Sequence, residues 1–467
     1  AMTGVLRAGL ILSNINPLYT PAETRRQLDD CNAKALIFID LFGDKIDTLA
    51  EGGLNIHLIK LRLTDFFSPL KALALDAALK YARRLVPTMH THHVRFIDAI
   101  KMADRHDSGE ISYTEEQDAN APNFYQYSGG TTGKSKGVEL TFSGLMHNID
   151  QVGSLAPDLM EKERQTVLLV MPLYHMFGFY MAMSGLKLGG HIILIPSPRP
   201  LKNLKPAFEK FPPHVFPGVN TLFTGLLKED WFLANPPPLE FTATGATALN
   251  SSVAKQWRAV TGADILESYG MTEATTVLTS NPPGDRMREG SVGLPIPGVS
   301  IRILKDDDSW ATTGEAGEIV ARGPQLMKRY FNAPEESEKA FFDGWLRTGD
   351  IGYLDKDGYL FLVDRKKDMI IISGFNVFPN EIEDALTQYE GVSEAGVVGI
   401  DDGETGEKII AFIVPQSTEI PKSDLDAHCN RLLTNYKRPR QYIFVDELPK
   451  TPVGKILRRE LRDRVLP

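Results

Sequence analysis

Residues 124–142 read FYQYSGGTTGKSKGVELTF and hold a loop rich in glycine, hydroxyl side chains and lysine between two strand-like runs. Glycines let backbone N–H groups converge on phosphate oxygens, while threonine hydroxyls and a lysine add hydrogen bonds and charge. We therefore predict a phosphate-binding loop, with a generic glycine-rich turn as the alternative. Its candidate binding residues are Ser128, Gly130, Thr131, Thr132, Gly133 and Lys136.

The loop differs from a Walker-type phosphate loop in two respects. Ser128 stands where that motif requires its first glycine. Residues 138–142 then alternate in polarity like a strand, whereas a Walker-type loop opens a helix whose N-terminus faces the phosphates. The sequence therefore predicts a strand after the loop.

The segments on either side of this loop predict an α/β protein. Residues 10–39 resemble a βαβ unit: a strand at 10–13, a helix capped by Thr20 with Pro21 in its first turn, and a strand at 35–39. From 124 to 363, short apolar strands alternate with helix-like stretches, a pattern typical of mixed sheets flanked by helices. We expect a large N-terminal domain of this kind (1–363), a hinge at the charged run 364–367, and a smaller, mobile α+β C-terminal domain (368–467).

Composition excludes several classes of protein. The 467 residues suggest two to four structural units, and 42% hydrophobic with 24% charged residues are average values, so neither disorder nor a fibrous repeat is indicated. A net charge of −9 argues against a general nucleic-acid-binding surface. Cys31 and Cys429 lie far apart without metal-ligand spacing, and no run reaches the ~20 apolar residues of a spanning helix. A reducing, cytoplasmic location fits.

A further helix is predicted at residues 70–86, where Lys71, Lys80, Arg83 and Arg84 accompany leucines, alanines and Tyr81. Its apolar arc is wide, although Lys71 falls inside it. Peripheral attachment to an anionic membrane is one interpretation. An ordinary surface helix is the other, and the sequence favours it.

Further motifs place the phosphate loop in a family. Residues 127–137, YGMTE at 269–273, GWLRTGD at 344–350, the segment 364–383 and PVGK at 452–455 resemble, in order, motifs of the acyl-adenylate-forming superfamily. Within it, residues 364–370, 373–383 and 455–462 are similar to bacterial long-chain fatty acid–CoA ligases. Residues 6–20 resemble the interior of these ligases, so we expect the family's preceding N-terminal segment to be missing from this sequence.

The resemblance implies roles around the adenylate. Tyr269 and Gly270 match the adenine-binding motif, and the Tyr269 ring offers a face to the base, although a buried core tyrosine is the alternative. The segment beginning Gly245-Ala246 resembles the one whose backbone borders adenine. Asp350 can accept hydrogen bonds from both ribose hydroxyls, and Arg365 is expected on the same ribose or a nearby phosphate. The alternatives are that Asp350 belongs to an ordinary turn and Arg365 to an ordinary surface pair.

Other matches imply catalytic and metal-binding roles. Glu273 and Thr272 supply hard oxygens suited to Mg²⁺ on ATP phosphates, with a helix cap as the alternative. Lys455 matches the lysine that meets the fatty carboxylate and the α-phosphate. His175 matches a position beside the carboxylate, and a core histidine with a backbone partner is equally open. Lys367 is the expected pivot of the hinge.

The function implied is that of an AMP-forming ligase. It would activate a fatty carboxylate, expected to be long-chain, with ATP to give acyl-AMP, and then transfer the acyl group to coenzyme A. An acyl tunnel is expected near residues 218–221. The alternatives are a fatty acyl-AMP ligase without efficient transfer to coenzyme A, or a catalytically impaired nucleotide-binding scaffold associated with a membrane. Location at the inner face of the membrane and a homodimer stay open, and nucleic acid is not an expected partner.

Overall fold

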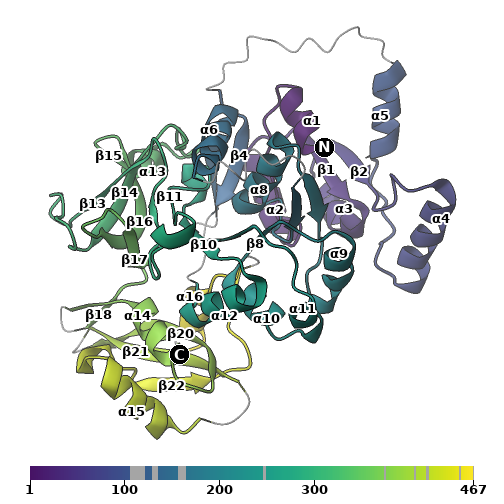
Figure 1. Cartoon of the computed structure of the whole chain (residues 1–467). Coiled ribbons are helices and arrows are strands. Elements are labelled where there is room, and N and C mark those ends of the chain that lie inside the picture. The colour runs from purple at the N-terminus through teal and green to yellow at the C-terminus, as the bar shows by residue number, and fades with distance from the viewer. Residues whose placement is uncertain are drawn as a thin grey trace. The chain divides into compact units, whose positions relative to one another are not determined.

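The computed structural model describes residues 1–105, 121–128, 135–155, 165–245, 249–365, 367–372, 375–403, 406–416, 420–451 and 454–465 (Figure 1). The chain divides into two compact units. The first comprises Ala1–Leu145 and Met327–Ser337, and the second comprises Met146–Leu326 and Glu338–Pro467. The predicted division at 364–367 does not correspond to a boundary between these units and stays a prediction.

The first unit contains a small parallel sheet, in which the helix and the second strand of the predicted βαβ unit are confirmed. Strands β1 (Ala35–Ile39), β2 (His57–Leu61) and β3 (Val94–Arg95) pair in that order. Helix α2 (Pro21–Asp30) begins with a capping box, because the Thr20 hydroxyl accepts from Glu23 N and the Glu23 carboxylate accepts from Thr20 N. Helix α3 (Gly43–Glu51), preceded by the short η1 (Asp40–Phe42), packs Ile46 and Leu49 against Phe38 and Leu58.

The predicted strand at residues 10–13 is wrong. Only Leu12 pairs, through an isolated bridge to Phe124, and it follows the short helix α1 (Met2–Arg7). Four residues with a single backbone partner do not extend into a ladder.

The phosphate loop joins two strands of a hairpin. Strands β4 (Phe124–Ser128) and β5 (Lys136–Leu140) are antiparallel, and Ser128 is opposite Lys136. A strand therefore follows the loop, as predicted, and a helix of the Walker type does not. Arg329 pairs with the buried Glu139 carboxylate at 3.0 Å and joins residues 327–337 to the hairpin.

The remaining helices of the first unit connect these strands. The predicted helix at 70–86 is observed as α4 followed by a single π-helical turn, η2. Helix α5 follows β3, and α6 follows β5 and crosses into the second unit. Their bounds are α4 (Pro69–Ala77), η2 (Ala78–Ala82), α5 (Phe96–Arg105) and α6 (Phe142–Gly153).

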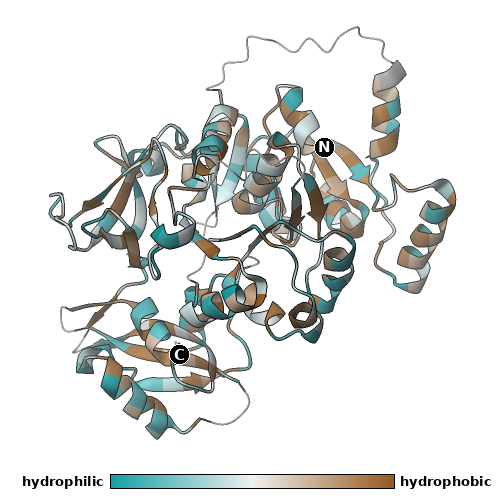
Figure 2. Ribbon diagram, viewed as in Figure 1, coloured by the Kyte–Doolittle hydropathy of each residue, from teal (hydrophilic) through white to brown (hydrophobic). Residues whose placement is uncertain are grey.

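The second unit is built on a seven-stranded sheet in the order β12-β11-β10-β9-β8-β6-β7. Strands β10, β9, β8, β6 and β7 are parallel to their neighbours in this group. Strand β11 pairs antiparallel with both β10 and β12. Strands β6 and β8 in the middle of this parallel group are apolar and buried (Figure 2), as expected for parallel strands covered on both faces. The bounds of the strands in the sheet are β6 (Thr166–Leu169), β7 (His191–Leu194), β8 (Val215–Gly218), β9 (Phe241–Thr244), β10 (Ile265–Tyr269), β11 (Thr279–Ser280) and β12 (Leu294–Pro295).

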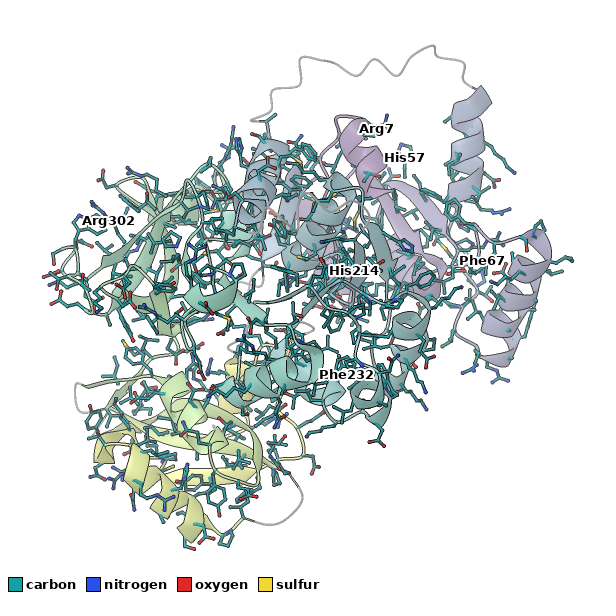
Figure 3. The ribbon with its side chains drawn as sticks, in the orientation of Figure 1. Arg7, His57, Phe67, His214, Phe232 and Arg302 are labelled. Carbon is teal, nitrogen blue, oxygen red and sulfur yellow. The ribbon has the colours of Figure 1, made fainter. Side chains whose placement is uncertain are left out.

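Helices cover this sheet and enclose an aromatic core. Phe216 on β8 lies against Phe208, Phe223 and Trp257, and the last of these stacks on Phe232, labelled in Figure 3. Large buried rings of this kind dominate the apolar area of a core. The helices are α8 (Met176–Lys187), η3 (Leu201–Asn203), α9 (Lys205–Lys210), α10 (Asn220–Leu226), α11 (Asp230–Ala234) and α12 (Ser251–Thr261), with the short turns η4 (Thr272–Ala274) and η5 (Gly284–Arg286).

An antiparallel sheet follows in the same unit. Its order is β13-β14-β16-β15. Strand β15 pairs with the first residues of the long strand β16, and β17 pairs with its second half. The bounds are β13 (Ser300–Leu304), β14 (Gly317–Arg322), β15 (Phe341–Phe342), β16 (Trp345–Leu354) and β17 (Leu360–Arg365), with helix α13 (Pro334–Lys339) before β15. Asp350 on β16 is opposite Arg365 on β17.

The C-terminal sheet buries both of its faces. Val397 and Val398 are neighbours on β20, but one belongs to a cluster with Ile382 and Leu425 and the other to a cluster with Phe412. The order is β19-β18-β21-β20, and β22 pairs with β21. The bounds are β18 (Ile370–Ile372), β19 (Phe375–Val377), α14 (Pro379–Thr387), β20 (Val392–Gly403), β21 (Gly406–Pro415), α15 (Lys422–Leu432), η6 (Asn435–Lys437), β22 (Gln441–Phe444) and α16 (Arg458–Asp463).

The observed mixture of sheets and helices agrees with the predicted α/β fold class. Among the described residues, no helix is both long enough and apolar enough to cross a membrane.

Candidate active site

Four predicted segments follow the carboxyl ends of parallel strands in the second unit. His175 comes after β6, Val219 after β8, Gly245 after β9 and Gly270 after β10. In open α/β sheets, ligands bind at this edge, because the loops from neighbouring strands meet there. The sheet therefore brings together segments that are up to about a hundred residues apart in the chain.

The turn after β10 is too tight for a side chain at Gly270. A Cβ atom at this position would lie 1.5 Å from the carbonyl oxygen of Thr276. The chain then enters η4, which contains Thr272 and the buried Glu273, and leaves it through Thr275 in the left-handed conformation. The glycine lets the backbone reverse closely enough to place Thr272 and Glu273 directly after the strand.

Tyr269, Asp350 and Arg365 form a connected group. The Tyr269 hydroxyl donates to Asp350 Oδ2 at 2.7 Å, and Arg365 Nε lies 3.3 Å from Asp350 Oδ1. Asp350 N also donates to the Thr348 hydroxyl at 3.1 Å, which fixes the backbone of the strand. Burial, and then the Asp350 carboxylate, raises the pKa of Tyr269 well above its ordinary value, so the hydroxyl stays a neutral donor.

The Asp350 carboxylate retains capacity for a ligand. Each oxygen of an ionised carboxylate has two lone pairs, and each is engaged once by the contacts given above. A pair of hydroxyl groups can therefore still donate to it. This capacity suits the predicted ribose role.

Lys455 lies in a tight turn beside the segment after β8. Thr451 N donates to Lys455 O at 2.8 Å, and Lys455 N donates to the Thr451 hydroxyl at 3.1 Å. Gly454 has a φ of +80°, and a Cβ atom there would lie 3.6 Å from Thr221 Oγ1 and from Val219 Cγ2. The loop thus lies against residues 219–221, where the acyl tunnel was expected to begin.

The charge of Lys455 is strongly influenced by its surroundings. Burial, and next the Arg365 cation, lowers its pKa to about 7, while Asp350 opposes this shift. Lys455 is therefore within electrostatic reach of the Tyr269–Asp350–Arg365 group. An amine with a pKa near 7 is easily protonated when an anionic ligand arrives.

His175 has a structural partner. It is the N-cap of α8, and its Nδ1 accepts from Phe177 N at 3.3 Å. Burial lowers its pKa, so the ring is neutral, with its proton assigned to Nε2. The structure therefore contains the backbone partner that the alternative interpretation of His175 expected. A role of Nε2 beside the substrate carboxylate stays a prediction.

The predicted phosphate loop lies in the first unit, and only its ends are described. Ser128 ends β4, its carbonyl accepts from the Ser135 hydroxyl at 2.8 Å, and Lys136 Nζ lies 5.0 Å from the centre of the Tyr330 ring. Gly130, Thr131, Thr132 and Gly133 lie outside the described residues, as does Ala246 of the adenine segment. Their predicted roles stay predictions.

Lys367, the predicted pivot, lies in the turn after β17, where Asp368 N donates to Arg365 O at 3.0 Å. The pivot role is untested.

Glu267 is a carboxyl group that the sequence prediction missed. It lies on β10 opposite Thr244, and its Oε1 accepts from Leu249 N at 3.1 Å, so it borders the segment after β9. Burial raises its pKa to about 7. The available signal was an acidic residue, Glu267, directly after the apolar pair Ile265-Leu266 and two residues before the YGMTE motif.

The donor set at η4 fits Mg²⁺. This ion prefers hard oxygens and is usually held by one or two carboxylates together with substrate phosphates, and it keeps several waters. The Glu273 carboxylate and the Thr272 hydroxyl are such donors, on adjacent residues. They would hold the ion against the phosphates of a nucleotide.

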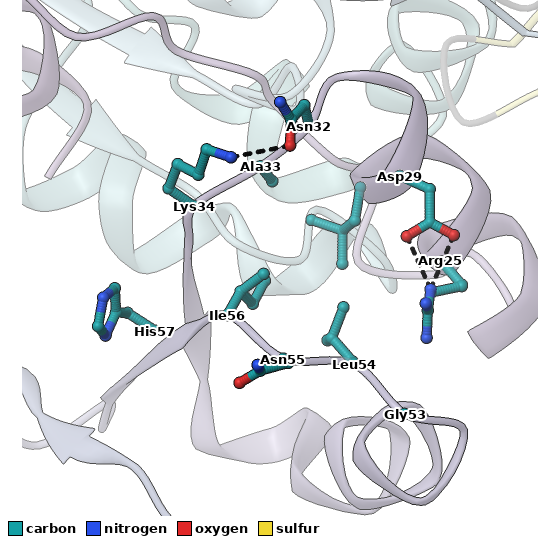
Figure 4. A pocket seen from close by; sticks show the side chains of 11 residues that line it. Arg25, Asp29, Asn32, Ala33, Lys34, Gly53, Leu54, Asn55, Ile56 and His57 are labelled. Carbon is teal, nitrogen blue, oxygen red and sulfur yellow. Dashed lines mark hydrogen bonds and ion pairs between the residues drawn. The ribbon is translucent and has the colours of Figure 1, made fainter.

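A surface pocket of the first unit is lined by α2, the following turn and the start of β2 (Figure 4). Its charged side chains already have partners. Arg25 Nε donates to both carboxylate oxygens of Asp29 at 2.8 Å, and Lys34 Nζ donates to Asn32 Oδ1 at 2.9 Å. None of the predicted binding residues is among those that line it, so we assign it no part in the chemistry.

Comparison with protein families gives two matches. The profile described as AMP-binding enzyme matches residues 1–331, and the profile described as AMP-binding enzyme C-terminal domain matches residues 381–455.

Curated relatives match along nearly the whole chain. A long-chain-fatty-acid–CoA ligase of Salmonella typhimurium is 40% identical over 467 residues, which cover 99% of this chain and 82% of the relative. A protein of the same name from Bacillus subtilis is 34% identical over 474 residues, covering 98% of this chain and 82% of the relative.

Solved structures agree with the fold. ATP-bound MatB from Rhodopseudomonas palustris superposes with a TM-score of 0.80 at 28% identity, over 99% of this chain and 85% of that one. A benzoate CoA ligase from Burkholderia xenovorans LB400 gives a TM-score of 0.81 at 26% identity, over 99% and 86% of the two chains. These similarities confirm the predicted α/β fold class.

Proposed function

Because this chain belongs to the AMP-binding enzyme family, we propose that it is an AMP-forming ligase that joins a long-chain fatty acid to coenzyme A with the use of ATP. The observation that carries the proposal is the group of Tyr269, Asp350, Arg365 and Lys455 beside the carboxyl edge of the parallel sheet. The fatty acid is inferred from the names of the curated relatives. ATP and coenzyme A are co-substrates.

The first half-reaction forms the acyl-adenylate. A carboxylate oxygen of the fatty acid attacks the α-phosphorus of ATP, a phosphoanhydride bond breaks and pyrophosphate leaves. Asp350 accepts hydrogen bonds from the ribose hydroxyls, and the protonated Lys455 offsets the negative charge that develops on the phosphoryl oxygens. Mg²⁺ held by Thr272 and Glu273, when bound, supplies further positive charge at the phosphates.

The second half-reaction forms the thioester. The thiol of coenzyme A loses its proton to solvent and its sulfur attacks the acyl carbonyl; the bond to the adenylate oxygen breaks and AMP leaves. Because AMP is a good leaving group, the chemistry needs no nucleophile from the protein, and neither Cys31 nor Cys429 has a role. Burial raises the pKa of both thiols, which keeps them protonated and unreactive.

Substitution of Lys455 separates the two steps. Lys455→Ala should lower adenylate formation, measured as fatty-acid-dependent pyrophosphate exchange into ATP, by at least about a hundredfold. Thioester formation from supplied acyl-AMP and coenzyme A should remain near the wild-type rate. Lys422→Ala, at an exposed lysine at the start of α15, is the matched control. Equal loss of both half-reactions would contradict the assignment of Lys455.

A second variant addresses the hinge. The two half-reactions need different residues beside the same carbonyl and phosphate, and rotation of residues 368–467 about Lys367 would exchange them. Lys367→Pro should spare pyrophosphate exchange and slow thioester formation. An unchanged overall rate would exclude Lys367 as the pivot.

Substrate range and assembly follow from direct measurements. Acids of graded length, incubated with ATP, Mg²⁺ and coenzyme A, should yield AMP and thioesters in equal amounts by mass spectrometry, with long-chain acids preferred. Acyl-AMP without thioester would instead indicate the fatty acyl-AMP ligase alternative. Omission of Mg²⁺ should abolish turnover.

Light scattering after gel filtration tests the predicted homodimer. The proposed location is cytoplasmic, with contact at the inner face of the membrane.

A further inference from the structure

Helix α4 and the π-helical turn η2 direct their apolar stripe toward solvent. Leu70, Leu73, Ala74, Ala77 and Tyr81 recur at the spacing of one helical face, and all five are exposed. The exposed fraction is 83% for Leu70, 69% for Leu73 and 73% for Tyr81. No residue of α4 or η2, all of which are described, is buried. A surface helix of a globular protein normally turns such a stripe inward.

Two phenylalanines before the helix extend the exposed apolar surface. Phe66 is 73% exposed and Phe67 is 46% exposed, and Phe67 lies beside α4 in Figure 3. After η2, Leu85 is exposed as well. In Figure 2 the brown apolar residues of α4 recur between teal polar ones. Phe66, Phe67, Leu70, Leu73, Tyr81 and Leu85 are called the α4 surface below.

Cations border the α4 surface, and the two acidic residues of the segment share one arginine. Lys71, Lys80, Arg83 and Arg84 are all exposed. The only acidic residues between 62 and 86 are Asp65 and Asp76, and both pair with Arg62 at 2.9 Å. Residues 62–86 therefore hold five cations against two acids, a net charge of +3, on a chain whose net charge is −9.

Aromatic rings and cations are interleaved in a way that suits a lipid interface. Lys71 Nζ lies 4.5 Å from the centre of the Phe67 ring, and Lys80 Nζ lies 5.8 Å from that of Tyr81. Long cationic side chains keep their charge at the level of lipid headgroups while their stems and neighbouring rings enter the acyl boundary. A soluble partner would not need this combination of leucines, rings and flanking cations.

We propose that the α4 surface docks on a membrane that contains anionic phospholipid, with α4 lying in the plane of the interface. The four cations are complementary to the headgroups, and the leucines and rings enter the acyl boundary. A second copy of the chain is a poorer occupant, because a two-fold interface on this surface would bring the four cations of one protomer toward the same four of the other. The inference concerns the first unit alone and does not depend on the proposed catalytic function.

Vesicle flotation tests the proposal without ATP, fatty acid or coenzyme A. The full chain should float with vesicles of 70% phosphatidylcholine and 30% phosphatidylglycerol, and at most weakly with pure phosphatidylcholine. Leu70→Glu/Leu73→Glu should weaken partitioning at least about a hundredfold, because it removes two leucines that would enter the acyl boundary and adds two negative charges. Leu18→Glu, at an exposed leucine outside the α4 surface, is the matched control and should float like the wild type.

Charge removal gives an independent readout. Lys80→Gln/Arg83→Gln should weaken partitioning into the same anionic vesicles about thirtyfold, which corresponds to about fivefold for each cation. Failure of the wild type to float with anionic vesicles would overturn the proposal, as would equal flotation of the wild type and Leu70→Glu/Leu73→Glu. The α4 surface would instead belong to a second copy of the chain under two conditions. The wild type would not float with vesicles and would form a dimer in sedimentation velocity, and Leu70→Glu/Leu73→Glu would dissociate that dimer.

Discussion

Replacement of Arg458 by methionine should open the C-terminal sheet, and the loss should depend on pH. The Arg458 side chain is only 9% exposed and donates to both carboxylate oxygens of Glu383 at 2.9 and 2.8 Å and to Asn380 Oδ1 at 2.6 Å. It also lies 3.6 Å from Asp368. Methionine preserves most of the volume of the side chain but leaves Glu383 without its cation.

The size of the loss follows from the burial of Glu383. Removal of one partner of a buried ion pair costs about 3–5 kcal/mol where the remaining group stays charged, and less where that group takes up a proton. Burial raises the pKa of Glu383 to about 7, and Arg458 opposes this shift, so the variant raises it further. At a pH between about 4.5, the ordinary pKa of the group, and its raised pKa, Glu383 is protonated in the folded state and ionised in the unfolded chain. Stability therefore falls as the pH rises.

The pH dependence separates the variant from the wild type. Between pH 6 and 8, the wild-type Glu383 changes from protonated to ionised, which lowers stability by about 1.4 kcal/mol. In Arg458→Met the pKa of the carboxyl is higher, so the fall over the same range is larger and approaches about 2.7 kcal/mol, the value for a carboxyl that stays protonated to pH 8. The penalty of the substitution should therefore be larger at pH 8 than at pH 6, by up to about 1.4 kcal/mol.

Hydrogen exchange measures this opening locally. Protection of the β20 and β21 amides, corrected for intrinsic exchange rates, should fall more at pH 8 than at pH 6 in Arg458→Met, by up to about tenfold. Arg459→Met, at the exposed neighbour, is the matched control. The reasoning would be refuted by equal penalties at the two pH values, or by a control that opens the sheet as much as the variant does.

Three further outcomes are expected. Gly270→Ala should destabilise the protein by more than about 4 kcal/mol, seen as a lower melting temperature, because its Cβ would collide with the Thr276 carbonyl; an unchanged melting temperature would show that the turn can relax. Tyr269→Phe removes the donor to Asp350 and should raise KM for ATP about tenfold in pyrophosphate exchange, whereas an unaltered KM would place that contact outside nucleotide binding. Because the Lys455 cation is present below its pKa of about 7 and lost above it, kcat/KM for adenylation should fall about tenfold per pH unit above 7. Lys455→Arg, which stays protonated, should remove that fall, and its persistence in this variant would assign it to another group.

Local signals predicted the elements that depend on neighbouring residues. The Thr20, Pro21 and Glu23 pattern predicted the start of α2, and the apolar run at 35–39 predicted β1, because caps and strand patterns act over a few residues. The π-helical turn after α4 and the failure of residues 10–13 to extend as a strand had no such signal. Both depend on partners that a local pattern does not specify.

The contacts of the candidate site depend on long-range pairing. Motifs identified Tyr269 and Asp350 separately, but their hydrogen bond joins residues 81 positions apart, and the contact between Asp350 and Arg365 requires the register of β16 and β17. The same is true of Lys455, whose pKa is set by burial and by Arg365. His175 illustrates the opposite case, because a local cap accounts for its Nδ1 contact and leaves only Nε2 for chemistry.

The two apolar clusters on opposite faces of the C-terminal sheet have a consequence for how the protein can evolve. Among the residues that the structure describes, each cluster is formed by side chains between 370 and 465. In the proposed hinge, Asp364 is buried and accepts from Asn380 N at 2.8 Å, so its substitution would disturb the start of α14. Lys367 is exposed and belongs to neither cluster, so selection on the proposed hinge can act there with little penalty in folding.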